Sequence, residues 1–147
     1  KVPQVTIYAK QAGVSIAPFE RRSEGRSTEG RISLRFFKLE SGSSAIRFLA
    51  EPAEAFELHG KMHKVYQNGG KESLNHRFEG RDGEVQTRLT VERWERGGKS
   101  GFAFSVQRGE EELNVPVNSD RFLHAAEFLR HLSLHQAWVE ELERPQV

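Results

Sequence analysis

The chain has 147 residues, 36% apolar and 29% charged, with a mean hydropathy of −0.66. That size suits one domain, and these proportions exclude collagen, low-complexity fibres and disorder over the full length. The absence of cysteine excludes disulfides, Cys-based zinc sites and thiol catalysis, while the net charge of +1 excludes neither acidic nor basic partners.

The N-terminal third is predicted to hold strands separated by polar turns. Weak strand patterns cover residues 5–8 and 14–19, and alternation over 31–39 predicts a clear strand that a turn at 41–44 joins to a shorter one at 45–49. The stretch 20–30 has no apolar residue, so we expect a loop there. We therefore divide the chain into N-terminal strands with a basic polar loop, 1–30, and an α+β core with C-terminal helices, 31–147.

Pro52 at a first helical position predicts a helix that ends at 68–70. Strands are expected over 73–78, 84–95, 101–107 and 113–117. A helix follows, capped by Ser119 or Asp120. This helix is expected to continue over 134–142, where Trp138 and Leu142 lie four residues apart. One helical face carries Ala55, Leu58, Met62 and Val65. The predicted class is α+β: an antiparallel sheet of about five to six strands, one inserted helix and a C-terminal helical segment.

The sequence does not favour an enzyme. Residues 97–100, GGKS, resemble the end of a phosphate-binding loop, but Arg93 holds the required earlier glycine position and a strand follows, so we expect a hairpin turn. No serine lies in a GxSxG frame, and the carboxylates of 110–112 fall in a turn open to water.

Two histidine pairs have the i, i+4 spacing that can present two imidazoles to one metal ion, His59 with His63 and His131 with His135. Neither pair has the glutamate of an HExxH motif, and no cysteine is present to complete a site. We therefore expect no metal, no cofactor, and stability that does not change when a chelator is added.

Alternation predicts a second sheet face, opposite the core, that carries cations beside aromatic rings. Such a surface favours single-stranded nucleic acid, because arginines meet phosphates while rings stack on unpaired bases. The alternative is that the rings lie beneath the 20–30 loop or form a contact between copies of the chain. The candidate nucleic-acid-binding residues are Arg35, Phe37, Arg47, Arg77, Arg88, Trp94, Arg96 and Lys99.

Charge is unevenly distributed along the chain. Residues 1–109 hold 19 Lys and Arg against 13 Asp and Glu, whereas residues 110–147 hold 3 against 8. A basic body favours a polyanionic partner, although the excess is below that of a dedicated duplex binder and is also compatible with ordinary solvated charge. Fifteen arginines against seven lysines, a single Met and abundant Glu are compatible with a heat-adapted protein.

The segments GGKESLNHRFEG, TRLTVERWERGGKSGFAFSVQRGEEELNVPV and DRFLHAAEFLRHLSLHQAWVE resemble the archaeal single-stranded DNA-binding proteins of the ThermoDBP type. The resemblance implies a compact α+β core, sequence-tolerant binding of single strands, and homo-oligomers. A more distant resemblance is to the PC4 and Whirly group, in which an antiparallel sheet and a dimerising helix bind single strands.

We expect sequence-independent binding of single-stranded DNA through arginine–phosphate contacts and aromatic stacking. Single-stranded RNA and a protein-interaction or oligomer-assembly role are the alternatives, since no motif reports on a 2′-hydroxyl. No apolar run approaches the about 20 residues that span a bilayer. We expect a cytoplasmic protein with no membrane partner, associated with the nucleoid if it binds DNA.

Overall fold

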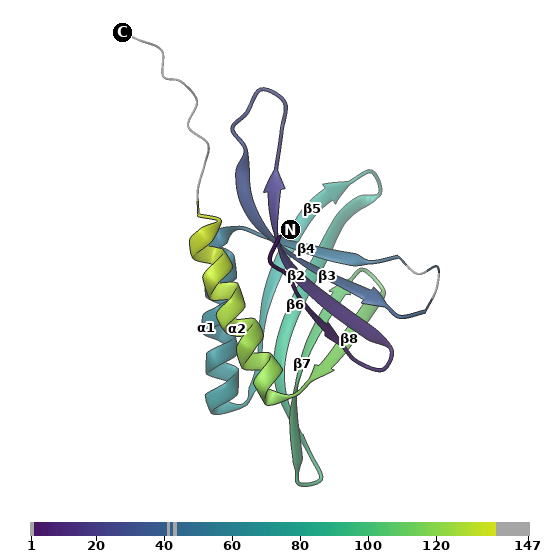
Figure 1. Cartoon of the computed structure of the whole chain (residues 1–147). Coiled ribbons are helices and arrows are strands. Elements are labelled where there is room, and N and C mark those ends of the chain that lie inside the picture. The colour runs from purple at the N-terminus through teal and green to yellow at the C-terminus, as the bar shows by residue number, and fades with distance from the viewer. Residues whose placement is uncertain (1, 41, 43, 138–147) are drawn as a thin grey trace.

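A computed structural model describes residues 2–40, 42 and 44–137 of the chain (Figure 1). Eight strands form two four-stranded antiparallel sheets, and in both sheets the spatial order follows the order along the chain. Sheet A contains β1 (Val5–Tyr8), β2 (Ala12–Arg21), β3 (Glu29–Lys38) and β4 (Ile46–Ala50), and is followed by helix α1 (Pro52–Asn68). Sheet B contains β5 (Gly70–Gly80), β6 (Gly83–Arg96), β7 (Lys99–Arg108) and β8 (Glu111–Val117), and is followed by helix α2 (Ser119–His135).

The α+β class, with one inserted helix and one C-terminal helix, is confirmed. The strands are more numerous than the expected five to six, and they are divided between two sheets. The division occurs at α1, whose 17 residues separate β4 from β5, so that β5 begins a new sheet. The expected hairpin turn at GGKS is also confirmed, because Gly97 and Gly98 have positive φ angles of 55° and 81° between β6 and β7.

The expected loop over 20–30 is shorter than predicted. The β2–β3 ladder continues through the pairs Glu20↔Gly30 and Arg21↔Glu29, which leaves only residues 22–28 between the strands. A hairpin that extends beyond the core needs no apolar side chain, because its backbone groups satisfy each other while both faces meet water. Absence of apolar residues therefore did not mark the end of the strand.

The two helices lie side by side and cover the inner faces of both sheets (Figure 1). The predicted apolar face of α1 is confirmed, since its four residues are at most 1% exposed. From α2, the Phe122 ring stacks on Phe102 of β7 at 4.5 Å between centroids and meets Phe104 at 5.5 Å. One continuous core thus joins sheet A, sheet B and the helix pair, and it leaves the opposite face of each sheet uncovered by helix.

The ends of α2 differ from the sequence expectation. The N-cap is Asn118, one residue before the expected candidates, and its Oδ1 accepts a hydrogen bond from the Arg121 backbone N–H at 2.9 Å. Helix α2 ends at His135, so the predicted continuation over 134–142 is confirmed at 134 and 135 and is wrong at 136 and 137, which are not helical. Trp138 and Leu142 lie outside the described residues. Neither described helix is long and apolar enough to cross a membrane.

The buried side chain of Gln136 fixes the end of α2 to sheet A. Its Nε2 donates to the backbone carbonyls of Phe19 and Arg31, each at 3.1 Å, and these two residues face each other in the β2–β3 ladder. A buried side-chain amide that donates to two strand carbonyls is a specific link, because the amide needs hydrogen-bond partners where water is largely excluded. This contact adds to the apolar packing of α2 and links its C-terminal end to the β2–β3 ladder.

Candidate nucleic-acid interface

The candidate residues lie on two surfaces. We call the side of sheet A that faces away from the helices face A, and the corresponding side of sheet B face B. The strand registers place Arg35, Phe37 and Arg47 on face A. They place Arg77, Arg88, Trp94, Arg96 and Lys99 on face B. The expectation of one shared face is corrected, because β3 and β6 belong to different sheets.

On face B, the partly buried indole of Trp94 lies over Gly101, its direct partner on β7. A Cβ atom at this glycine would collide with the carbons of the indole ring, so only glycine permits so close an approach. The guanidinium carbon of Arg96 lies 5.9 Å from the indole centroid. One side of the Trp94 ring therefore packs against the sheet, and the guanidinium group of Arg96 lies near the ring.

A groove of about 530 Å³ extends from Trp94 across face B. The side chains of Ala103 and Ser105 on β7 are small and leave this space open, and Lys71 and Arg88 also line it. Acidic side chains of β6 and β8 contribute as well, Glu92 and Glu112. Face B is consequently a hollow of mixed charge, with its aromatic ring toward one end of β6.

The arginines of face B differ in how fully neighbouring groups neutralise their positive charge. The Nε of Arg88 donates to the neutral Oδ1 of Asn75 at 3.0 Å, an amide that also accepts from Gln86 at 2.9 Å. This contact orients the guanidinium without neutralising it. By contrast, Arg77 lies 3.6 Å from a carboxylate oxygen of Glu84, so its charge is partly offset. Arg88 is therefore better suited than Arg77 to meet a phosphate.

Face A repeats the aromatic-on-glycine arrangement. Phe37 of β3 faces Gly13 of β2, and a Cβ at this glycine would lie 2.6 Å from the Phe37 Cζ. The guanidinium carbon of Arg35 lies 5.4 Å from the Phe37 centroid. The ring of Tyr8, which is 67% exposed, meets Phe37 edge-on at 5.9 Å.

The two arginines of face A are direct cross-strand partners, Arg35 on β3 and Arg47 on β4. Within the residues that the structure describes, neither has a carboxylate partner, and Arg47 lies over the ring of Phe19 at 5.2 Å. Like charges directly opposite each other destabilise a strand pair. The two side chains reduce this repulsion by lying over different rings, Arg35 over Phe37 and Arg47 over Phe19.

Sequence reasoning missed the four residues that complete these arrangements, namely Tyr8, Gly13, Phe19 and Gly101. A glycine inside a strand pattern often marks a close approach by another group, and both glycines lie inside strands. The sequence patterns placed Gly13 outside a predicted strand and Gly101 at the first residue of one, and the ring that lies on each glycine comes from a neighbouring strand. Only the strand register identifies it.

No family model and no curated protein matches this chain. Among solved structures, the plant transcriptional regulator PBF-2 matches with a TM-score of 0.56 and 19% identity, over 92% of this chain and 82% of that one. WHY1 from Arabidopsis thaliana matches with a TM-score of 0.58 and 16% identity, over 92% of this chain and 91% of that one. Both are plant Whirly proteins, so the chain has the fold of the more distant of its two sequence resemblances, and the ThermoDBP resemblance is not confirmed.

Proposed function

We propose that this protein binds single-stranded nucleic acid without sequence readout, through faces A and B. The observation that carries the proposal is the repeated arrangement of an aromatic ring on a glycine with an arginine beside it, Trp94 on Gly101 and Phe37 on Gly13. Two unrelated pairs of strands build it, and both place it on the side of a sheet that the helices leave open.

The energies favour exchange of the arginine for a base. A cation over an exposed ring contributes about 0.5–1 kcal/mol, whereas a stacked base contributes about 1–3 kcal/mol. A base can therefore take the open side of the Trp94 ring, and Arg96 is then released toward the phosphate of the same nucleotide. Duplex DNA offers no comparable contact, because its bases are already stacked on each other.

The main alternative is that each ring covers the backbone of its glycine to stabilise the sheet, or that the faces join copies of the chain. Charge argues against the second possibility. A contact between two copies of face A would bring together the guanidinium groups of Arg35 and Arg47 from both copies, with no carboxylate partner among the described residues, and such like-charge contacts are costly. The description of PBF-2 as a transcriptional regulator also supports a nucleic-acid ligand.

The test is an anisotropy titration of a labelled oligo-dT strand with the wild-type protein and three alanine variants. We expect Trp94→Ala and Phe37→Ala to weaken binding by about 1–3 kcal/mol each, the value of one stacked base. Phe78→Ala is the matched control, because its ring also carries an arginine, Arg108 at 5.2 Å, and is 46% exposed, but it shares the inner side of sheet B with Leu74.

Unchanged affinity in Phe78→Ala, with losses in the other two variants, would support both faces. Equal losses in all three variants would contradict the assignment to the outer faces. Unchanged affinity in all three variants would show that stacking of bases on these rings does not contribute to binding. An oligo-U strand in the same assay reports whether the ligand is DNA or RNA.

A further inference from the structure

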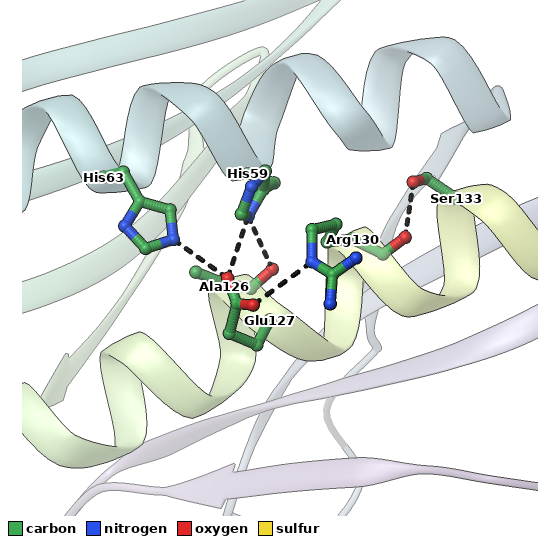
Figure 2. Close-up of polar contacts among 6 residues, drawn as sticks. All are labelled: His59, His63, Ala126, Glu127, Arg130 and Ser133. Atoms are coloured by element: carbon green, nitrogen blue, oxygen red, sulfur yellow. Dashed lines mark hydrogen bonds and ion pairs between the residues drawn. The ribbon is translucent and has the colours of Figure 1, made fainter.

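Helices α1 and α2 bring together two imidazoles and a carboxylate at their contact (Figure 2). His59 and His63 lie one turn apart on α1, and Glu127 reaches them from α2. One nitrogen from each ring and one oxygen of the carboxylate all lie within 4.8 Å of one another. This cluster lies apart from faces A and B and takes no part in the proposed nucleic-acid binding.

Two of the three ligand distances fit a tetrahedral ion. Zinc bonds of about 2.0–2.1 Å imply about 3.3 Å between neighbouring ligand atoms of a tetrahedron. The Oε2 of Glu127 lies 3.0 Å from the His63 Nε2 and 3.5 Å from the His59 Nδ1. The His59 Nδ1 also donates a hydrogen bond to the backbone carbonyl oxygen of Ala126 at 3.1 Å, so the His59 ring must give up this bond before it can bind an ion (Figure 2).

Arg130 binds one oxygen of the Glu127 carboxylate and leaves the other oxygen to the two histidines. Its Nε donates to Oε1 at 3.1 Å, while the two imidazoles face Oε2 (Figure 2). The hydrogen bond from His63, followed by that from Arg130, lowers the pKa of Glu127 below its ordinary value of 4.5 and keeps the group ionised. A ligating carboxylate whose second oxygen is held by a donor is typical of metal sites in proteins.

Exposure of the cluster suits an ion that arrives from solvent. The His59 side chain is 14% exposed and the His63 side chain 37%, while Glu127 is half exposed. Nitrogen and carboxylate ligands without sulfur suit zinc and its divalent neighbours among the transition metals, and three protein ligands leave one position for water.

We propose that His59, His63 and Glu127 form a binding site for a divalent transition-metal ion of the zinc class, with water as the fourth ligand. The expectation of no metal rested on the spacing of the histidines along one helix, which shows no third ligand. Glu127 supplies that ligand from 64 residues further along the chain. The ion takes the place of the hydrogen bond between the His63 Nε2 and the carboxylate, so binding links α1 to α2.

The test uses tag-free protein that has been stripped of metal with a chelator and then titrated with Co²⁺. A tetrahedral Co²⁺ site gives strong visible d–d absorption, whereas hydrated Co²⁺ absorbs weakly. We expect one equivalent to bind, Zn²⁺ to abolish the absorption by displacement, and Zn²⁺ to raise the melting temperature of the stripped protein by mass action.

Two kinds of variant make the test specific. Glu127→Gln preserves the side-chain shape, and we expect it to weaken Co²⁺ binding by more than about tenfold, as should His63→Ala. The matched control is His131→Ala combined with His135→Ala, a second i, i+4 pair on α2 whose rings stack at 5.9 Å and which has no third ligand among the described residues. We expect this control to bind Co²⁺ like the wild type.

Absence of tetrahedral Co²⁺ absorption in the stripped wild type would overturn the proposal. Loss of the absorption in the His131/His135 variant, with retention in Glu127→Gln, would overturn it as well. Circular dichroism of each variant shows that it is folded before the titration. Nucleic-acid binding is measured separately, so failure of either proposal leaves the other standing.

Discussion

Trp94 and Gly101 face each other across β6 and β7, and the indole lies over the glycine so closely that a methyl group there would displace it. Phe37 and Gly13 have the same relationship in the other sheet. In both cases the glycine sets the height of the ring above the backbone. A substitution at the glycine can therefore change the height of the ring above the sheet while the ring itself is kept.

Gly101→Ala should weaken binding of oligo-dT while Trp94 is still present. The added methyl group lifts or tilts the indole, and we expect part of the about 1–3 kcal/mol of one stacked base to be lost. Gly13→Ala should displace Phe37 as well, but its Cβ would also lie 2.9 Å from the backbone oxygen of Ile7, so this variant should lose stability in addition to binding. Anisotropy titrations of the two variants measure the effect.

Gly60→Ala is the control for these glycine variants. Gly60 lies on the exposed side of α1 with no heavy atom near the position of an added Cβ. The substitution should raise the free energy of unfolding by about 0.5–1 kcal/mol, because alanine favours a helix interior over glycine, and it should leave binding unchanged. A binding loss in Gly60→Ala equal to that in Gly101→Ala would refute the role of ring height.

Arg35→Ala and Arg47→Ala should each reduce the salt dependence of binding. For single strands, each phosphate contact contributes about −0.7 to the slope of log affinity against log salt concentration. Loss of one contact should therefore make the slope shallower by about 0.7. Arg121→Ala, an exposed position on α2 away from both faces, should leave the slope as it is. If all three slopes coincide, face A does not contact phosphate.

Secondary structure was largely predictable because it depends on short-range pattern. The alternation of Ile32, Leu34 and Phe36 marked β3 and its buried face, and all three side chains are fully buried. Pairing was not predictable, because alternation does not tell which strand lies beside another. The N-cap was missed for a related reason: residues 118–120 are Asn, Ser and Asp, which all cap well, so residue type alone did not identify Asn118.

Gln136→Ala should lower stability without changing affinity for nucleic acid. The substitution leaves the carbonyls of Phe19 and Arg31 without the amide donor from α2, and a buried unsatisfied polar group costs about 1–3 kcal/mol. Urea unfolding measures this loss. Gln67→Ala on the exposed side of α1 is the control and should stay within about 0.5 kcal/mol of the wild type. Equal stability of the two variants would show that the Gln136 link does not hold α2.

The candidate site was predictable in part. Alternation placed Arg88 and Trp94 on the side of β6 opposite Leu89, and the registers confirm that placement. It did not separate face A from face B, because that requires knowledge of the sheet boundary at α1. The contact between His63 and Glu127 could not be predicted from the sequence, because it depends on how the two helices pack against each other.

The most direct test is the fluorescence of Trp94 in a Trp138→Phe protein, where Trp94 is the sole tryptophan. Stacking of a base on the indole should quench this signal, with the same concentration dependence as the anisotropy change, when oligo-dT is added. Duplex of the same length should bind more weakly and cause little quenching. Binding of oligo-dT without quenching, or equal binding and quenching with duplex, would contradict a single-strand interface built around Trp94.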